Sequence, residues 1–318
     1  ILNNMKIKHL LCFIALCLFF TPGKAQQLSV MTLRNGATVY IWEDKSKPDV
    51  FGMIAFKVGS VDDPEQYTGL AHYLEHVMFK GTQTIDALDW EKEKPIYEKI
   101  IAKYDERAAL SDPAAREAVD KEINDLTREA AQYAAGNEFS LLVDHMGGQG
   151  LNASTGYDQT EYHNSFPPSQ LEKWLEIYSE RLIDPVFRGF QTELEAVYEE
   201  YNMYNDDRGS RMREFIYEQA FGDHPYARPI IGLPEHLKNP QLSKLIDFYN
   251  TWYGPQNMSI ILVGNIDAKE AIPMIRDKFE RVPRRAEIHR EKKPVRQFKG
   301  RTEKSAKIFY YPMLALIY

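Results

Sequence analysis

Residues 69–82 read GLAHYLEHVMFKGT and place two histidines and a glutamate within five consecutive positions. The stretch predicts a helix over about 69–79, on which His72 and His76 lie one turn apart on one face. Glu75 falls within about 100° of both at a helical step of about 100° per residue. Two such imidazoles can bind one zinc ion while the carboxylate reaches a bound water. An ordinary amphipathic helix with two surface histidines is the alternative.

A third ligand can be sought on the helix predicted over 190–206, within the stretch TELEAVYEEYNMYND (192–206). Glu193 and Glu200 fall on one stripe of this helix, together with Ala196 and Val197. Carboxylates on a packed stripe cost free energy unless they are paired or bind a metal. Glu200 as a third ligand and Glu193 as a supporting acid would explain both, whereas the alternative is an acidic helix with a solvated face.

The remaining patterns indicate an α+β fold. An Asn-Gly pair within alternating apolar and polar residues predicts a β-hairpin over 28–44. Further strands are expected at 49–60, twice within 150–166 and at 258–264, and helices at 168–182, 190–206, 208–221, 240–252 and 267–280. Strands, then helices, then a last strand predict an antiparallel-rich mixed sheet with helices packed on one face.

Residues 88–146 are charged, alanine-rich and of helical period, which predicts a helical hairpin inserted into the domain. The two halves are separated by Asp112 and Pro113, which suit the N-cap and the first position of a second helix. The hairpin is interpreted either as a surface elaboration without a chemical role or as an arm that binds a partner.

The composition excludes some functions. The chain has 318 residues, 44% of them apolar, which suffices for one large domain or two modest ones. A net charge of −7 argues against a general nucleic-acid binder. The basic run over 284–303 is interpreted as a solvated linker, and 304–318 as the start of a truncated second domain.

The N-terminal residues predict a signal peptide over 1–25, with residues 1–4 lying upstream of the start methionine. The apolar run over 10–20 is too short to span a bilayer, so no permanent membrane span is expected. The protein is therefore expected to be exported, to the periplasm or the outside of a bacterial envelope. Both cysteines lie in the signal, so the mature chain would have neither disulfides nor thiolate zinc ligands.

The motif segment 56–82, FKVGSVDDPEQYTGLAHYLEHVMFKGT, resembles the active-site segment of the pitrilysin/insulinase family of zinc peptidases, which carry an inverted HxxEH motif. The similarity spans roughly residues 28–283. It continues, in order, through GLNAST (150–155), ELEAVYEE (193–200), HPYARPIIGLPEHL (224–237) and FYNTWYGPQNMSIILVGNID (248–267).

The resemblance implies a role for each residue of the motif. His72, His76 and Glu200 would be the ligands of one zinc ion. Glu75 would be the general base that acts on a zinc-bound water, and Glu193 would support the site. The implied activity is that of an endopeptidase cleaving peptides or unfolded protein segments.

The resemblance also implies substrate contacts and a partner. The family's edge strand pairs with the substrate backbone, which makes Asn152, Ala153 and Ser154 candidate substrate contacts. The family adds a second homologous half without zinc ligands, expected here as a missing part or a separate subunit. The alternative function is therefore a non-cleaving assembly or substrate-binding subunit that pairs with a complementary half. Four further histidines match no role and are expected in packing or on the surface: His145, His163, His224 and His236.

Overall fold

The structure is a computed structural model that describes residues 27–318 except 291–292, 295, 299, 309–312 and 317–318. The expected signal peptide, residues 1–25, lies outside the described residues. None of the described helices combines the length and the apolar composition needed to cross a membrane.

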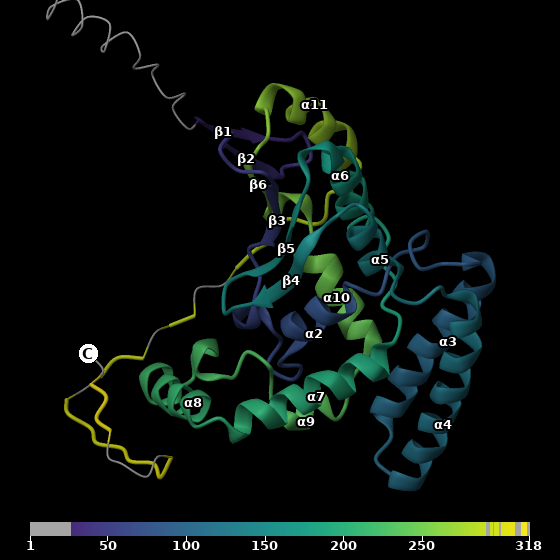
Figure 1. Cartoon of the computed structure of the whole chain (residues 1–318). Helices are drawn as coiled ribbons and strands as arrows, with labels where there is room; N and C mark the ends of the chain where they lie inside the picture. Colours follow the sequence, from purple (N-terminus) through teal and green to yellow (C-terminus); the bar gives the residue numbers. More distant parts are fainter. Residues whose placement is uncertain (1–26, 291–292, 295, 299, 309–312, 317–318) are drawn as a thin grey trace, which may run out of the picture.

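A six-stranded open sheet forms the centre of the molecule (Figure 1). Its strands are β1 (Gln27–Thr32), β2 (Thr38–Glu43), β3 (Val50–Phe56), β4 (Gln149–Thr155), β5 (Thr160–Phe166) and β6 (Met258–Gly264). Their spatial order is β1-β2-β6-β3-β5-β4. Only β2 and β6 run parallel, and the other neighbouring pairs are antiparallel. The predicted antiparallel-rich mixed sheet is therefore confirmed.

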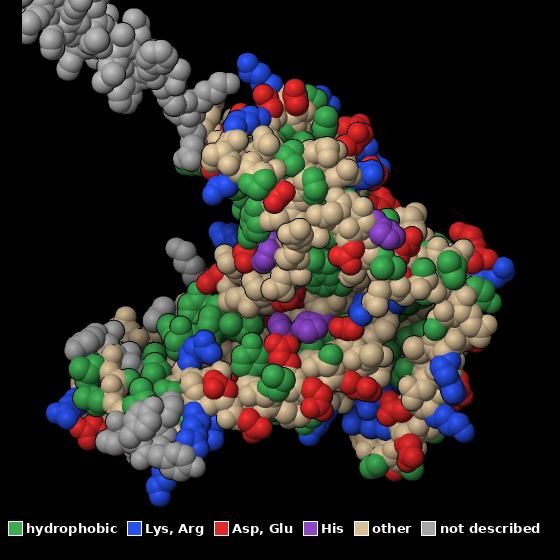
Figure 2. Space-filling model, viewed as in Figure 1, with side chains coloured by type: hydrophobic (Ala, Val, Ile, Leu, Met, Phe, Trp, Pro, Cys, Tyr) green, Lys and Arg blue, Asp and Glu red, His purple; other side chains and the backbone are tan. Residues whose placement is uncertain are grey.

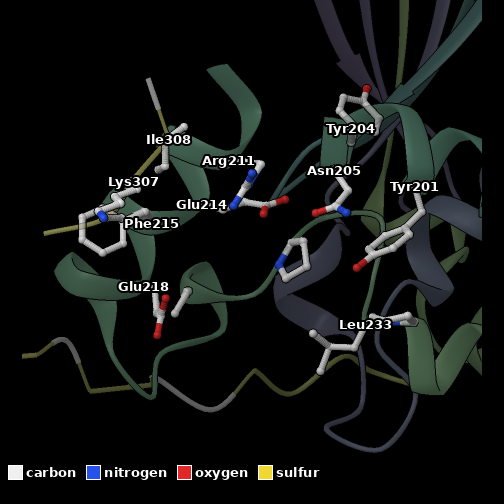
Figure 3. Close-up of a pocket in the computed structure, with 14 residues that line it drawn as sticks. Tyr201, Tyr204, Asn205, Arg211, Glu214, Phe215, Glu218, Leu233, Lys307 and Ile308 are labelled. Atoms are coloured by element: carbon white, nitrogen blue, oxygen red, sulfur yellow. The ribbon is translucent and has the colours of Figure 1, made fainter. Parts of the chain in front are cut away.

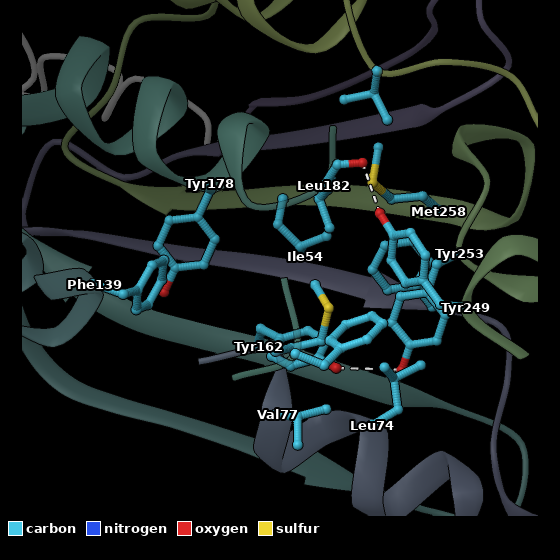
Figure 4. Packing of buried hydrophobic residues seen from close by; sticks show 14 of the residues in the cluster. Ile54, Leu74, Val77, Phe139, Tyr162, Tyr178, Leu182, Tyr249, Tyr253 and Met258 are labelled. Atoms are coloured by element: carbon cyan, nitrogen blue, oxygen red, sulfur yellow. Dashed lines mark hydrogen bonds between the residues drawn. The ribbon is translucent and has the colours of Figure 1, made fainter. Parts of the chain in front are cut away.

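Helices cover one face of this sheet, as predicted. Burial alternates residue by residue along β3, β5 and β6, so one face of each strand lies in the core. Figure 4 shows side chains of this face packed between the strands and the helices. The covering helices are α2 (Leu70–Val77), α5 (Glu138–His145), α6 (Leu171–Glu180), α10 (Leu242–Trp252) and α11 (Ala268–Phe279).

The opposite face of the sheet is open and partly apolar. Val30, Tyr40, Trp42 and Val263 are exposed there. Three more helices, α7 (Phe190–Asp206), α8 (Arg208–Phe221) and the short α9 (Pro234–Leu237), form a lower layer beneath α2 (Figure 1).

The predicted helical hairpin consists of α3 (Trp90–Ala109) and α4 (Pro113–Ala130), which pack against each other as an arm at the side of the molecule (Figure 1). The side chain of Asp112 accepts a hydrogen bond from the N–H of Ala115 at 2.8 Å and so caps α4, as predicted. The sequence interpretation extended the hairpin to residue 146. Helix α5, inside that range, instead packs against β4 and α6.

Beyond Val282, the described residues form neither helix nor strand. These residues include the described part of the predicted linker, 284–303. The described residues of 304–318, interpreted above as the start of a second domain, likewise contain no strand.

Candidate metal centre

Helix α2 carries three of the candidate residues and is oriented by its apolar side. Leu74 and Val77 are completely buried, and Figure 4 shows both pointing toward the sheet. His72 and His76 lie on the other side of the helix, facing α7. The side chain of His72 is only 11% exposed and that of His76 23% exposed, so neither is a free surface histidine.

Helix α7 supplies the two acidic candidates, and Tyr73 joins it to α2. The hydroxyl of Tyr73 donates a hydrogen bond to the carbonyl oxygen of Phe190, and the two rings lie 4.9 Å apart. The stripe prediction for α7 is partly wrong, because Ala196 is exposed whereas Val197 is completely buried. Glu193 and Glu200 therefore lie at the border of the packed side, where they remain accessible to the histidines.

Three ligand atoms converge between the two helices. Oε2 of Glu200 lies 3.7 Å from Nε2 of His72 and 3.5 Å from Nε2 of His76. Ligand atoms at about 2.0–2.1 Å from a tetrahedral zinc ion are separated by roughly 3.3–3.4 Å, so the spacing fits. Two imidazole nitrogens and a carboxylate oxygen also suit zinc better than calcium or magnesium. Within the described part of the chain, no other group of three potential ligands converges in this way.

Glu193 contacts the far side of the same cluster. Its Oε2 lies 3.5 Å from Nδ1 of His76, and its Oε1 forms an ion pair with Nζ of Lys80 at 2.6 Å. A carboxylate on the second nitrogen of a histidine fixes the ring orientation and favours Nε2 as the ligand atom. His72 lacks such a partner, because its buried Nδ1 has no hydrogen bond to the described residues.

Glu75 is buried beside the histidines and held from the edge strand. Its side chain accepts a hydrogen bond on Oε2 from the hydroxyl of Thr155 at 2.6 Å. Burial raises the pKa of Glu75, and the hydrogen bond from Thr155 opposes this shift. A carboxyl with a raised pKa, next to a possible metal, is well placed to accept and return a proton.

The two histidines have opposite pKa shifts in the metal-free protein. Burial, reinforced by the charge of His76, lowers the pKa of His72 to about 4. Burial would also lower the pKa of His76, but its hydrogen bonds to Glu193 and Glu200 outweigh burial and raise that pKa to about 9. The hydrogen bond from His76 in turn lowers the pKa of Glu200. The cluster thus holds a proton where a metal ion would replace it.

Both ends of α2 are fixed by buried charged residues that the sequence did not single out. At the start of the helix, the carboxylate of Asp63 accepts hydrogen bonds from the N–H groups of Gly69 at 2.7 Å and Ala71 at 2.9 Å. Both carboxylate oxygens of this buried residue are used to cap the helix.

At the other end, the guanidinium of Arg181 donates to the carbonyl oxygen of Met78 at 3.0 Å. Arg181 is almost completely buried, and its charge lies among aromatic rings. The guanidinium carbon is 4.4–4.9 Å from the ring centres of Phe139, Tyr162 and Phe79. Cation–π attraction of this kind can hold a desolvated guanidinium in place.

The candidate substrate contacts lie on β4, which is the edge strand of the sheet next to α2. The side chains of Asn152 and Ser154 are exposed, whereas Ala153 packs against the core. Among the residues that the structure describes, the strand pairs only with β5, so its other edge can accept an added strand.

The four histidines that match no role in the motif lie outside the cluster. His145 is exposed at the end of α5, and the ring of His163 lies 5.4 Å from that of Phe51. Nδ1 of His224 accepts from the N–H of Tyr226, while Nδ1 of His236 accepts from that of Thr68.

In Figure 2, histidine side chains with acidic ones beside them gather in the hollow between the sheet and the lower helices, over α2 and α7. A separate cavity of about 440 Å³ opens at the C-terminal end of α7. Figure 3 shows Tyr201, Tyr204 and Asn205 of α7 on one side of it and Arg211, Glu214 and Phe215 of α8 on the other.

Curated proteins with similar sequences are named zinc proteases. The E. coli (strain K12) protein named probable zinc protease PqqL is 25% identical over 270 residues, which cover 81% of this chain and 23% of that protein. The uncharacterized zinc protease ML0855 of Mycobacterium leprae (strain TN) is 26% identical over 224 residues, which cover 70% of this chain and 39% of that protein. This chain therefore spans well under half the length of these relatives.

Solved structures share the fold. A protease from Helicobacter pylori matches with a TM-score of 0.64 at 22% identity, covering 83% of this chain and 52% of that one. The first half of the periplasmic protease PqqL from E. coli matches with a TM-score of 0.63 at 25% identity, covering 85% of this chain and 50% of that one.

Family models cover most of the described domain. The model for insulinase (peptidase family M16) matches residues 38–94 and 126–233, which include all the candidate metal ligands. The model for the peptidase M16 inactive domain matches residues 241–314. Residues 95–125, most of the hairpin, lie outside both matches. The chain belongs to the insulinase family, peptidase family M16, as its motifs predicted.

Proposed function

We propose that this protein is a zinc-dependent endopeptidase that hydrolyses peptides or unfolded protein segments. The observation that carries the proposal is the convergence of Nε2 of His72, Nε2 of His76 and Oε2 of Glu200 beside the buried carboxyl of Glu75. Relatives that are named zinc proteases support it.

Each residue of the cluster would have its own role in hydrolysis. When bound by the three ligands, zinc supplies Lewis-acid polarisation of a carbonyl and lowers the pKa of a water. Glu75 takes the proton of the attacking water and passes it to the leaving amine. Glu193 keeps the ring of His76 in its ligating orientation, and Lys80 balances the charge of Glu193.

The substrate would lie along β4. An extended peptide could add to the free edge of this strand, with backbone contacts at Asn152, Ala153 and Ser154. Recognition through the backbone requires an extended segment, which explains the preference proposed for peptides and unfolded stretches.

A second, homologous half would complete the substrate chamber. The solved first half of PqqL supports such a two-part arrangement, and the exposed apolar residues on the open sheet face offer a surface against which to pack. The description of PqqL as a periplasmic protease supports the proposed export, which would be directed by residues 1–25.

The test compares this chain with three variants: Glu75→Gln, Glu200→Gln and Glu199→Gln. The last is a matched control, since Glu199 is exposed on the same helix. Bound zinc is measured by elemental mass spectrometry, and cleavage of a mixed peptide library by peptide mass spectrometry, with and without an added second half.

We expect one zinc in the unmutated chain, Glu75→Gln and Glu199→Gln, with cleavage by the unmutated chain and Glu199→Gln only. Zinc without cleavage, even with the second half, would favour the non-cleaving assembly subunit. Absence of zinc binding by the unmutated chain would refute the proposed metal centre.

A further inference from the structure

Thr155 is a residue of the edge strand that contacts the candidate general base. It is the last residue of β4, and its hydroxyl donates to Oε2 of Glu75 at 2.6 Å. Among the described residues, no other hydrogen bond reaches the side chain of Glu75, although that residue is only 8% exposed. One hydroxyl therefore fixes the orientation of a buried carboxylate and leaves its other oxygen available to a water.

The pleat of β4 explains why Thr155 can make this contact. Leu151, Ala153 and Thr155 share the side of the strand that faces the core and α2, whereas Asn152 and Ser154 are exposed on the other side. The side chain of Thr155 is thus directed toward α2 by the same register that presents the strand's edge to solvent.

The backbone of Thr155 belongs to the free edge of the sheet. The N–H of Gly156 donates to the carbonyl oxygen of Gln159 at 2.7 Å, which makes this a hydrogen-bonded pair. Such pairs alternate in an antiparallel ladder, so the next pair, Thr155 with Thr160, is a non-hydrogen-bonded one. The N–H and C=O of Thr155 therefore point away from β5, toward an added strand.

We propose that Thr155 is a positioning residue that couples the edge strand to the orientation of the Glu75 carboxylate. Its backbone would meet the bound peptide while its side chain holds the base. This inference rests on the proposed peptidase function. Thr155 is not among the three candidate ligands, so the zinc affinity is not expected to depend on this residue.

The experiment uses a conservative pair of variants in the 318-residue chain with its second half added. Thr155→Val removes the hydroxyl with little change in shape, and Thr155→Ser keeps it. Thr251→Val is the matched control, because the hydroxyl of this exposed residue donates within α10, to the carbonyl oxygen of Asp247 at 2.7 Å. Bound zinc, kcat and KM are measured for each.

We expect Thr155→Val to lower kcat by about ten- to hundredfold, the usual effect of losing a group that orients a metal-site residue. Its KM and its zinc content should change by less than about twofold, since the hydroxyl contacts neither a ligand nor the strand edge. Thr155→Ser and Thr251→Val should behave like the unmutated chain.

A second readout does not depend on turnover. The dissociation constant is measured for a phosphinic peptide, whose tetrahedral group resembles the hydrated carbonyl, in backgrounds with Glu75 and with Glu75→Gln. Thr155→Val should weaken binding about tenfold when Glu75 is present and have no further effect in Glu75→Gln. An equal loss in both backgrounds would overturn the proposal, because Thr155 would then act through the strand alone.

Two other results would also overturn it: unchanged kcat in Thr155→Val, or equal losses in the Val and Ser variants with zinc retained. If the unmutated chain neither binds zinc nor cleaves, the proposed function fails, and Thr155 is judged by unfolding of the metal-free chain. Coupling of Thr155→Val with Glu75→Gln should then change the unfolding constant by roughly fivefold or more. Additive effects would show that no such contact exists.

Discussion

Glu199 and Glu200 are neighbours on α7, but only Glu200 approaches both histidines, at 3.5 and 3.7 Å. Replacing Glu200 by Gln exchanges the negatively charged carboxylate among the three candidate ligands for a neutral amide. We expect the zinc affinity to fall by at least about a hundredfold, measured by competition with a chromophoric chelator. Glu199→Gln, which makes the same change at an exposed position, should leave the affinity within about twofold. Equal losses in both variants would contradict the assignment.

His72 and His76 should give the metal-free protein a stability that depends on pH in both directions. The pKa of His72 is lowered from 6.5 to about 4. Its contribution to the free energy of unfolding is therefore lost as the pH falls from 6.5 toward 4. The pKa of His76 is raised from 6.5 to about 9, so its contribution is complete below 6.5 and is lost as the pH rises toward 9. The pair therefore contributes most near pH 6.5.

Denaturant unfolding in the presence of a chelator measures this contribution. The difference in the free energy of unfolding between the unmutated chain and the double variant His72→Ala/His76→Ala should be largest near pH 6.5. A difference that stays constant between pH 4 and 9 would show that the two rings titrate as they do in the unfolded chain.

At the scale of elements, α2 depends on how its first turn is capped. Asp63→Ala would leave two buried N–H groups, those of Gly69 and Ala71, without an acceptor. We expect a loss of roughly 2–4 kcal/mol in the free energy of unfolding. The comparable change at the exposed cap of α4, Asp112→Ala, should cost about 1 kcal/mol.

Zinc binding distinguishes the two caps further. Asp63→Ala should also weaken zinc binding, because α2 carries two of the three candidate ligands, whereas Asp112→Ala should not. If both variants lose the same free energy of unfolding and zinc binding is unchanged in both, the contacts of Asp63 do not stabilise α2.

The sequence predicted the features that depend on local spacing. His72, Glu75 and His76 lie within one helical turn and a half, and Glu193 and Glu200 share one helix, so periodicity alone aligns them. The roles of Asp63 and Arg181 could not be predicted, because their contacts with α2 depend on tertiary packing. Thr155 is 80 positions from Glu75, and nothing in its surroundings in sequence indicates that the two meet. The exposure of Ala196 was missed for the same reason.

At the scale of the whole molecule, a bound metal would join two layers. α2 packs on the sheet and α7 belongs to the lower layer, so removal of zinc should loosen the contact between them. A ligand present at a thousand times its dissociation constant stabilises the folded state by about 4 kcal/mol. For a domain of this size, that corresponds to roughly 10 °C in Tm.

Calorimetry with and without a chelator measures the shift. Glu75→Gln should show the full shift, because Glu75 is not among the three converging ligands, and Glu200→Gln should lose most of it. A chelator without effect on the unmutated chain would mean that the layers are held together by packing alone.

The strand order has a consequence for the growing protein. β2 and β3 follow each other in the chain but are separated in the sheet by β6, which comes last, at Met258–Gly264. While a ribosome is still making the chain, the β1–β2 hairpin has no neighbour to join, and β3 lacks one of its two partners. All six strands of the sheet can therefore pair only when nearly the whole domain has emerged. Until then, the unpaired apolar strands of a nascent chain are prone to aggregation.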